Sequence, residues 1–357
     1  MLIADLVESL RNVECKNHTK TPHIIIGRNT KKWYGGLQQG SVLSLAEHTG
    51  IVSYESTELV VTVRAGTTLQ ELNAVLLASG QCLPFEPPNF GKSASLGGTI
   101  ACNFSGPARP YVGSARDYVL GCTLLNGKGE MLKFGGQVMK NVAGYDVARL
   151  MAGSMGTLGV ILDISLKVLP LPESEITLVQ ALDQATALTT LQQYGLKPYP
   201  ITGAYWYDGQ LYVRLAGATG AVKQARSHIV GDVVEQGKVL WQQLRDHQSE
   251  FFQRQGNLWR LSVPADTPPL ALAGDCLVDW GGAQRWLWSE QTPEAIRAFI
   301  EPYGGYATLF RTNDESLRAS GNVFHPLSPS LLRYHQQLKQ AFDPHGIFNR
   351  QRMYLEF

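Results

Sequence analysis

The sequence predicts an α+β fold made of two unlike parts. Up to residue 170, short apolar strands alternate with helices and with long loops rich in glycine. Beyond LPLPES (169–174), apolar strand-like runs follow one another, with helical segments between several of them. The second pattern is typical of an antiparallel sheet with helices on one face, and the Pro-rich segment predicts the boundary between the two parts.

In the first part, one helix carries clear start and stop signals. Segment 67–80 begins with a capping-box pattern, Thr68 followed by Glu71, and ends at Gly80. The stretch 82–117 is rich in Pro, Gly, Ser and Asn, and we expect it to be a long functional loop. A short helix is expected at 145–152. Strands are expected at 23–27, 58–66 and 160–170, with a hairpin at 118–135 around the turn NGKG.

In the second part, apolar runs predict six strands: 175–182, 201–207, 210–217, 258–264, 276–280 and 306–310. Helices are expected at 185–195 and 239–252. The tail from residue 330 predicts a final helix that stops before Asp343-Pro344, because a residue that precedes proline disfavours the helical conformation. The chain is therefore expected to divide into residues 1–170, 171–329 and 330–357.

Composition excludes several classes of function. The 357 residues include 31 Lys and Arg against 30 Asp and Glu, without a long block of like charge, so a nucleic-acid surface is not indicated. No apolar run is long enough to span a membrane, and the first residues lack the order of a secretory signal. The five cysteines have no C-x-x-C spacing, which favours free thiols in a reducing cytosol and no metal site.

Three glycines, Gly153, Gly156 and Gly159, stand three apart in the segment before the last strand of the first part. Their order is helix, loop, strand, whereas a Rossmann fingerprint needs strand, loop, helix, and a Walker A loop needs a terminal Gly-Lys-Ser/Thr. A tight helix-to-strand turn explains them equally well. Taken with the Gly-rich segments at 27–31, 95–98, 103–106 and 113–114, they indicate backbone amides that surround an anion such as a pyrophosphate.

The order of these segments resembles a known family. The motifs are GRNTK (27–31), PFEPP (84–88), SLGGTIACNFSG (95–106), YVGSARD (111–117), KNVAGYD (140–146), GSMGTLGV (153–160) and DPHGIFN (343–349). Together they look like the FAD-binding domain of the vanillyl-alcohol oxidase and D-lactate dehydrogenase type. FEPPNFG (85–91), VDWGGAQRWLW (278–288) and the ending 333–354 look more like the FAD-binding E subunits of bacterial glycolate oxidase, over nearly the whole chain.

The resemblance implies a two-subdomain PCMH-type FAD-binding domain at 1–170, an α+β cap domain with an antiparallel sheet at 171–329, and a C-terminal segment at 330–357 that returns to the FAD domain. It also implies the cofactor-binding residues. These are Gly27, Arg28, Asn29, Thr30, Lys31, Ser95, Leu96, Gly97, Gly98, Asn103, Ser105, Gly106, Gly113, Ser114, Gly156, Thr157, Val160 and Asn349. Arg28 and Asn29 depart from the successive glycines usual in the first loop. Each glycine is alternatively a turn residue, and Asn349 alternatively a helix-end cap.

We expect non-covalent FAD, since residues 27–32 contain no His or Cys to tether it; Cys102, in the second loop, is more simply a buried thiol. No metal is expected, because none of the eight histidines belongs to the H-x-G-D-G-N-x-H motif of relatives that oxidise 2-hydroxy acids. No catalytic residue is assigned. Arg109, Arg116, Lys140 and Tyr145 are candidates to lie near the flavin, with structural pairing as the alternative for each.

The resemblance therefore implies a flavoprotein subunit that takes part in electron transfer during oxidation of glycolate to glyoxylate. Its implied partners are a D-type catalytic flavoprotein and an F-type iron–sulfur subunit. Two alternatives stay open: a self-sufficient FAD-dependent 2-hydroxy-acid dehydrogenase acting on D-lactate or glycolate, and a scaffold subunit without catalysis. A cytoplasmic location is expected, with attachment to the inner membrane through the complex as a further alternative.

Overall fold

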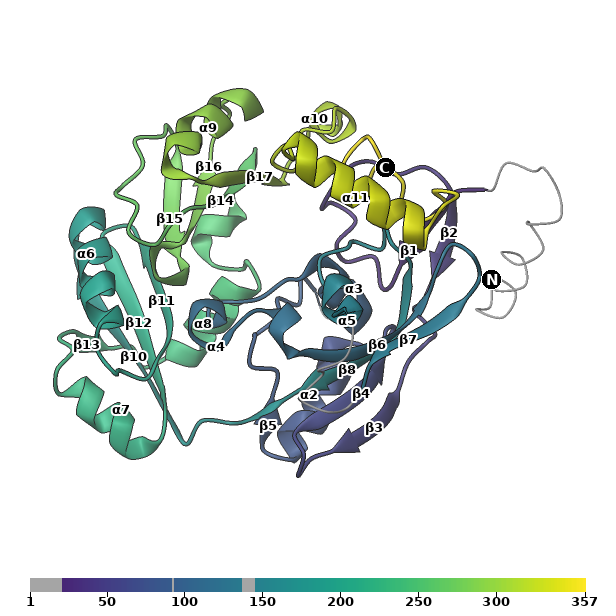
Figure 1. Ribbon diagram of the computed structural model, residues 1–357. Helices are drawn as coiled ribbons and strands as arrows, with labels where there is room; N and C mark the ends of the chain where they lie inside the picture. Colours follow the sequence, from purple (N-terminus) through teal and green to yellow (C-terminus); the bar gives the residue numbers. More distant parts are fainter. Residues whose placement is uncertain (1–20, 92, 137–144) are drawn as a thin grey trace.

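The computed structural model describes residues 21–91, 93–136 and 145–357, so Cys15 and Lys140 lie outside the described residues. Two large antiparallel sheets stand beside each other, one in each part of the chain (Figure 1). The expected α+β architecture, with an antiparallel sheet in the second part, is confirmed.

The first part is built on a five-stranded sheet in the order β3-β4-β8-β6-β7. Every neighbouring pair is antiparallel. The strands are β3 (Ile51–Glu55), β4 (Val60–Arg64), β8 (Val160–Lys167), β6 (Val119–Leu125) and β7 (Met131–Gly135). The hairpin expected at 118–135 and the strands expected at 58–66 and 160–170 are confirmed.

Helices α2 (Leu69–Ala78), α3 (Leu96–Cys102) and α5 (Val147–Leu150) contribute to one buried core with this sheet. The predicted capping box is present in α2: the Thr68 side chain accepts from the Glu71 amide, and the Glu71 carboxylate accepts from the Thr68 amide. At α5 the Asp146 carboxylate accepts from the Arg149 amide, which starts that helix. Local capping signals in the sequence therefore mark these helix starts correctly.

The stretch 82–117 differs from the long loop that we expected. It contains α3, α4 (Arg109–Val112) and the start of the 3₁₀ helix η2 (Ala115–Tyr118). Helix α3 forms because Leu96 and Ile100 are buried in the core, and because the Ala65 carbonyl, in the segment just after β4, accepts a backbone hydrogen bond from Gly97. Two glycines in its first turn hid this helix, since glycine disfavours helices unless tertiary packing compensates.

A smaller unit covers the edge of the first part. Strands β1 (His23–Ile26) and β2 (Ser41–Ser44) pair in parallel, and His23 also bridges to Phe348 of the C-terminal tail. The short strands β5 (Gln81–Cys82) and β9 (Leu169–Pro170) pair separately. The final helix α11 (Pro329–Phe342) ends one residue before Asp343, as predicted. It packs on the first part, where Leu338 and Phe342 contact the core.

The second part is an eight-stranded sheet in the order β13-β10-β12-β11-β15-β16-β14-β17. The strands are β10 (Ser174–Ala181), β11 (Ile201–Tyr207), β12 (Gln210–Gly217), β13 (Asp232–Val233), β14 (Leu258–Ser262), β15 (Asp275–Asp279), β16 (Gln284–Trp288) and β17 (Tyr306–Arg311). The helices are α6 (Gln184–Gly195), α7 (Thr219–Arg226), α8 (Gly237–Arg245), α9 (Pro293–Ile300) and α10 (Glu315–Ala319), with 3₁₀ turns η3 (Glu250–Gln253), η4 (Trp280–Gly282) and η5 (Glu301–Tyr303). All six predicted strands are present.

The expectation that helices cover one face of this sheet is incomplete. Helices α6 and α7 pack on the face to which Ala204 of β11 points. Helix α8 packs on the opposite face with Tyr205, the next residue of the same strand (Figure 1). The helix expected at 239–252 also ends early, at Arg245, because His247 adopts a left-handed backbone conformation with φ of 54°. Strands β2, β3, β5, β13 and β16 were not predicted.

The two parts share an aromatic core. Tyr34, Phe104 and Met155 of the first part are buried in one cluster with cap side chains such as Trp286 and Phe310. Ion pairs and hydrogen bonds surround this core: Arg214 pairs with Glu86 at 2.8 Å, and the Asn89 amide donates to Asp246 at 2.9 Å. This cluster holds the cap against the first domain.

Candidate functional site

A cavity of about 350 Å³ lies between β1, the loop that follows it, α3 and the C-terminal tail. Ile24, Ile25 and Ile26 give it an apolar wall, and polar loop residues face that wall across the cavity. This volume and this mixture of one apolar wall with a few polar groups are typical of cofactor pockets.

The loop after β1 forms one side of the cavity, which Gly27, Arg28, Asn29, Thr30 and Lys31 all line. A Cβ on Gly27 would overlap the Ser95 hydroxyl, so a larger residue here would displace the Ser95 side chain. Asn29 has φ of 58°, a left-handed conformation that asparagine tolerates better than most residues. The loop therefore turns sharply at residues 27–29 without the successive glycines of the resembling family.

Lys31 is a buried cation in this loop. Only 7% of the residue is exposed, and its ammonium group donates to the neighbouring Thr30 hydroxyl at 3.2 Å. Desolvation lowers the pKa of Lys31, against a smaller opposing effect of Cys102. Lys31 forms no ion pair within the described ranges. A buried ammonium without an acidic partner is costly, and a bound anion would offset that cost.

The start of α3 forms the next side. Ser95, Gly97 and Gly98 line the cavity, but the two glycines serve different needs. A Cβ on Gly97 would lie 2.6 Å from the Ala65 Cβ, so Gly97 allows α3 to pack against the chain after β4. A Cβ on Gly98 would lie 3.2 Å from the Ser95 hydroxyl oxygen and 3.9 Å from the Lys31 ammonium. Gly98 therefore keeps open the space next to the buried cation.

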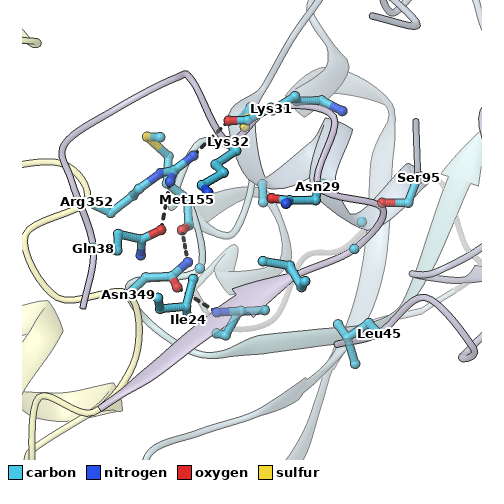
Figure 2. Close-up of a pocket in the computed structure, with 18 of the residues that line it drawn as sticks. Ile24, Asn29, Lys31, Lys32, Gln38, Leu45, Ser95, Met155, Asn349 and Arg352 are labelled. Atoms are coloured by element: carbon cyan, nitrogen blue, oxygen red, sulfur yellow. Dashed lines mark hydrogen bonds between the residues drawn. The ribbon is translucent and has the colours of Figure 1, made fainter. Parts of the chain in front are cut away.

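Asn349 ties three segments together beside the cavity (Figure 2). Its side chain donates to the Met155 carbonyl at 2.6 Å and accepts from the Ile25 amide at 2.8 Å. Its own amide donates to the His23 carbonyl at 3.0 Å. Asn349 lies seven residues after the end of α11, so the alternative of a helix-end cap is wrong. It holds β1, the loop at Gly156 and the tail in register around the cavity.

Arginine side chains complete the polar side. Arg352 donates to the Lys31 carbonyl at 2.9 Å and to the Gln38 side-chain oxygen at 2.7 Å (Figure 2). Arg318 donates to the Lys32 and Gly35 carbonyls, which fixes the loop from outside. Arg28 and Gln38 both line the cavity, and within the described residues their enclosed donors Nε and Nε2 have no hydrogen-bond partner. Unmet donors of this kind, together with Lys31, suit an anionic ligand such as the pyrophosphate of FAD.

The other residues expected to bind the cofactor lie elsewhere. Ser105 and Gly106 line a smaller cavity between the domains. Leu96 and Val160 are buried in the hydrophobic core, Asn103 accepts from the Arg116 amide, and Thr157 donates to the Ser154 carbonyl. Ser114 forms a capping box with Asp117, directly after Gly113, whose φ is 104°. None of these eight residues lines the larger cavity, because the smaller cavity, helix starts, a core strand and turns use them.

The described residues that were candidates to lie near the flavin do not come together at one site. Arg109 stacks on Trp280 of the cap at 4.4 Å, whereas Arg116 and Tyr145 are exposed, Tyr145 by 95%. Cys102 lines the larger cavity, and burial raises the pKa of its thiol. Cys82, Cys102, Cys122 and Cys276 are free thiols. Sequence reasoning assigned no role to the polar cavity residues Lys32, Gln38, Glu315, Arg318 and Arg352, of which only Arg352 lies in a quoted segment, the ending 333–354.

Two further searches of the described part of the chain bear on function. No group of three or more His, Cys, Asp or Glu side chains there is arranged to hold a metal ion. No helix there has both the length and the apolar character to cross a bilayer.

Comparison with known proteins adds independent evidence. Residues 5–135 match the family described as FAD binding domain. The chain is 47% identical over 337 residues to "Glycolate oxidase subunit GlcE" of Escherichia coli K12, which covers 94% of each chain. It is 34% identical over 169 residues to D-lactate dehydrogenase of Anaerostipes hadrus, covering 47% of this chain and 35% of that one.

A solved structure of alkyldihydroxyacetonephosphate synthase matches with a TM-score of 0.65 at 14% identity, over 97% of this chain and 74% of that one. This likeness concerns the fold, and it agrees with the PCMH-type FAD-binding domain and cap expected from the sequence. The similarity to GlcE, in contrast, covers 94% of this chain at 47% identity. The chain therefore belongs to the family of the glycolate oxidase subunit GlcE, which is built on an FAD binding domain.

Proposed function

We propose that this protein is the FAD-binding subunit of a glycolate oxidase (glycolate dehydrogenase) complex and takes part in electron transfer while glycolate is oxidised to glyoxylate. The observation that carries the proposal is the 47% identity to GlcE over 94% of both chains. The cavity supports it, since its free donors and buried cation suit the phosphates of FAD. FAD would supply an acceptor that takes two electrons and releases them one at a time.

Each cavity segment has a definite part in holding FAD. Lys31, Arg28 and the open space at Gly98 would receive the pyrophosphate, since they place positive charge and donors around one space. The apolar wall of β1 would exclude water from one side of the cofactor. Asn349 and Arg352 would act as positioning residues. Their side chains donate hydrogen bonds to the Met155 and Lys31 carbonyls, and these bonds hold the loops in place.

We assign residues 1–170 to the FAD-binding domain, 171–329 to the cap and 330–357 to a segment that returns to the FAD domain. The eight-stranded sheet begins at Ser174 and ends at Arg311, inside the cap range. Helix α11 packs on the core of the FAD domain, and the tail then pairs with β1. These contacts support the return of the tail.

The partners of this protein would be a D-type catalytic flavoprotein and an F-type iron–sulfur subunit. The substrate of the assembled complex would be a small 2-hydroxy acid. "Glycolate oxidase subunit GlcD" of Bacillus subtilis, 30% identical over 192 residues, is a relative with a subunit name of this kind. We propose a cytoplasmic location, with attachment to the inner membrane through this complex as the alternative.

The decisive experiment separates this subunit from a self-sufficient dehydrogenase. The full chain, loaded with FAD, is mixed anaerobically with glycolate or D-lactate while flavin absorbance is followed. We expect no reduction at a useful rate, because the histidine motif of self-sufficient relatives is absent from the sequence. Adding the D-type and F-type subunits is expected to restore turnover to a dye acceptor.

Two controls make the result specific. Dithionite must bleach the same sample, which shows that the flavin is reducible. The D-type and F-type subunits without this chain must be slower than the full set. Rapid bleaching of the lone chain by glycolate would favour the self-sufficient dehydrogenase, and equal turnover with and without FAD in this chain would favour a scaffold.

A further inference from the structure

The second part of the chain reaches the larger cavity through one short element, α10. Of the described residues that line this cavity, only Glu315 and Arg318 come from the second part. Arg318 donates from Nε to the Gly35 carbonyl at 3.0 Å and from Nη2 to the Lys32 carbonyl at 2.9 Å. Both carbonyls belong to the loop after β1, which borders the same cavity. One arginine of the second part therefore holds a loop of the first part at the edge of the cofactor site.

Helix α10 itself is loosely packed between two anchored ends. None of its residues is buried, and Leu317 is its member that packs, partly buried, against a described hydrophobic core. Before the helix, the Thr312 hydroxyl donates to the Asn257 side-chain oxygen at 2.6 Å. After it, Arg297 donates to two backbone carbonyls of the next segment, at 2.7 and 2.8 Å. An element with so few buried contacts opens locally at a lower free energy than the core that anchors it.

The two charged residues of α10 that line the cavity differ in what they offer an anion. Arg318 forms no ion pair within the described ranges, so its guanidinium is committed to the two loop carbonyls. Glu315 is exposed, and it is the one acidic residue among the described residues that line the cavity. A carboxylate at the rim repels a negatively charged pyrophosphate that passes it. Glu315 therefore reports whether a phosphate ligand enters on this side.

We propose that Arg318 is a positioning residue that closes the larger cavity from the second part of the chain, and that FAD enters and leaves where α10 moves away from the loop after β1. Arginine suits this task because its rigid fork donates to two carbonyls at once. Breaking both hydrogen bonds releases α10 from that loop, while the contacts of Thr312 and Arg297 keep its ends in place. The inference rests on the proposed function, since FAD is the ligand, and adds the route and the residue that closes it.

The first test measures release of FAD from the full chain. The loaded protein is diluted, and the rise in flavin fluorescence gives the dissociation rate. Arg318→Gln is expected to release FAD about tenfold faster, because two hydrogen bonds from a charged donor hold the closed position. Arg318→Lys is expected to lie between, since it keeps the charge but loses the fork. Arg333→Gln, at an exposed arginine of α11 that does not line the cavity, is the matched control and should match the wild type.

The second test identifies the route. The apo chain is mixed rapidly with FAD, and quenching of flavin fluorescence gives the association rate. At low salt Glu315→Gln is expected to bind FAD about twofold to threefold faster, because a like charge leaves the entrance, and high salt should remove this gain. Glu235→Gln removes the same charge from an exposed position of the second part outside the cavity and should change nothing. Because Glu315 is exposed, this test remains available if Arg318→Gln does not fold.

Hydrogen exchange separates a positioning role from a general loss of stability. Amides of residues 313–321 are expected to exchange faster in FAD-loaded Arg318→Gln than in the wild type, while those of α9 stay unchanged. Wild-type rates of FAD release from a folded Arg318→Gln, or equal association rates for Glu315→Gln and Glu235→Gln, would overturn this inference and leave the proposed function standing. A wild-type chain that binds no FAD would overturn the proposed function and this inference with it.

Discussion

At the scale of single residues, the site is defined by charged groups and hydrogen-bond donors that lack a partner among the described residues. Among the residues that the structure describes, Lys31 is buried without an acidic partner and Arg28 Nε and Gln38 Nε2 are enclosed without acceptors. Gly98 leaves open the space beside Lys31. By contrast, Gly97 packs against Ala65, which the fold alone explains. Residues of the same type in one motif therefore have different roles, and only contacts distinguish them.

Gly98→Val is expected to abolish FAD binding while the apo fold is kept. The added side chain would point towards the Ser95 hydroxyl and the Lys31 ammonium. No backbone atom lies closer to the new Cβ than these two groups. Flavin absorbance per protein after purification measures the loss, and circular dichroism checks the fold. Gly195→Val, at a helical glycine with open space around it, is the matched control and is expected to keep its flavin. Normal flavin content in Gly98→Val would show that this position is only a turn.

Asp279 gives the protein a pH-dependent stability. Burial raises the pKa of its carboxyl from 3.8 to about 7, although the Trp280 amide and the Gln284 side chain donate to it. A folded-state pKa above the unfolded value favours the protonated folded form, so this contribution to stability is full below pH 3.8 and is lost as the pH rises towards 7.

Asp279→Asn is therefore expected to become more stable relative to the wild type as the pH rises. Between pH 5 and 7 the difference in free energy of unfolding should grow by about 2 kcal/mol. Denaturant unfolding at both pH values measures it. Asp266→Asn, which removes an exposed carboxylate of the same domain, is the control. A constant difference across this range would contradict the raised pKa.

At the scale of elements, the end of α11 sets the position of the C-terminal tail. The Lys339 ammonium donates to the Thr157 and Phe348 carbonyls and to the Asp343 carboxylate, all within 2.8 Å. Asp343 in turn accepts from the Ile347 and Phe348 amides. This buried pair connects α11 to the glycine loop and directs the tail to β1, where Asn349 lines the cofactor cavity.

Lys339→Met is expected to lower both stability and FAD affinity. Removing one partner of a buried pair leaves the other charge uncompensated, at a cost of about 3 kcal/mol. Thermal unfolding of the apo protein measures the first effect, and titration with FAD the second. Lys223→Met, at an exposed lysine on α7, should change neither. Unaltered FAD affinity in a destabilised Lys339→Met would show that the tail does not depend on this pair.

At the scale of the whole molecule, one aromatic core joins the two parts of the chain. Tyr34 and Phe104 from the first part meet Trp286 and Phe310 from the second. The larger cavity is lined mostly by the first part, with Glu315 and Arg318 from the second part and Asn349 and Arg352 from the tail, and the smaller cavity lies between the two parts. Cys102 is close enough to line the larger cavity, yet burial disfavours its thiolate, the reactive form of a cysteine.

Non-covalent FAD is the prediction at this scale. Acid precipitation of the purified protein is expected to leave the yellow chromophore in the supernatant, since the loop at 27–32 has no tethering residue. Cys102→Ser is expected to purify with the same flavin content and to release it in the same way. Flavin that stays in the wild-type pellet and leaves it in Cys102→Ser would instead identify Cys102 as a covalent link.

The sequence by itself determined the α+β class, most strands, the capped helices and four of the segments that meet at the cavity, 27–31, 95–98, 153–159 and 343–349, whereas the expected segments 103–106 and 113–114 do not reach it. It did so because apolar periodicity, capping pairs and glycine-rich motifs are local signals. Only the tertiary structure decided that α3 is a helix, that α8 covers the inner face of the cap sheet, and that Arg318 and Arg352 reach the first loop. Among the described residues, Arg260 pairs with no carboxylate and His247 Nδ1 has no hydrogen-bond partner, and both facts depend on what surrounds each side chain. Burial and the absence of a partner arise from contacts between residues distant in the chain, which local spacing does not encode.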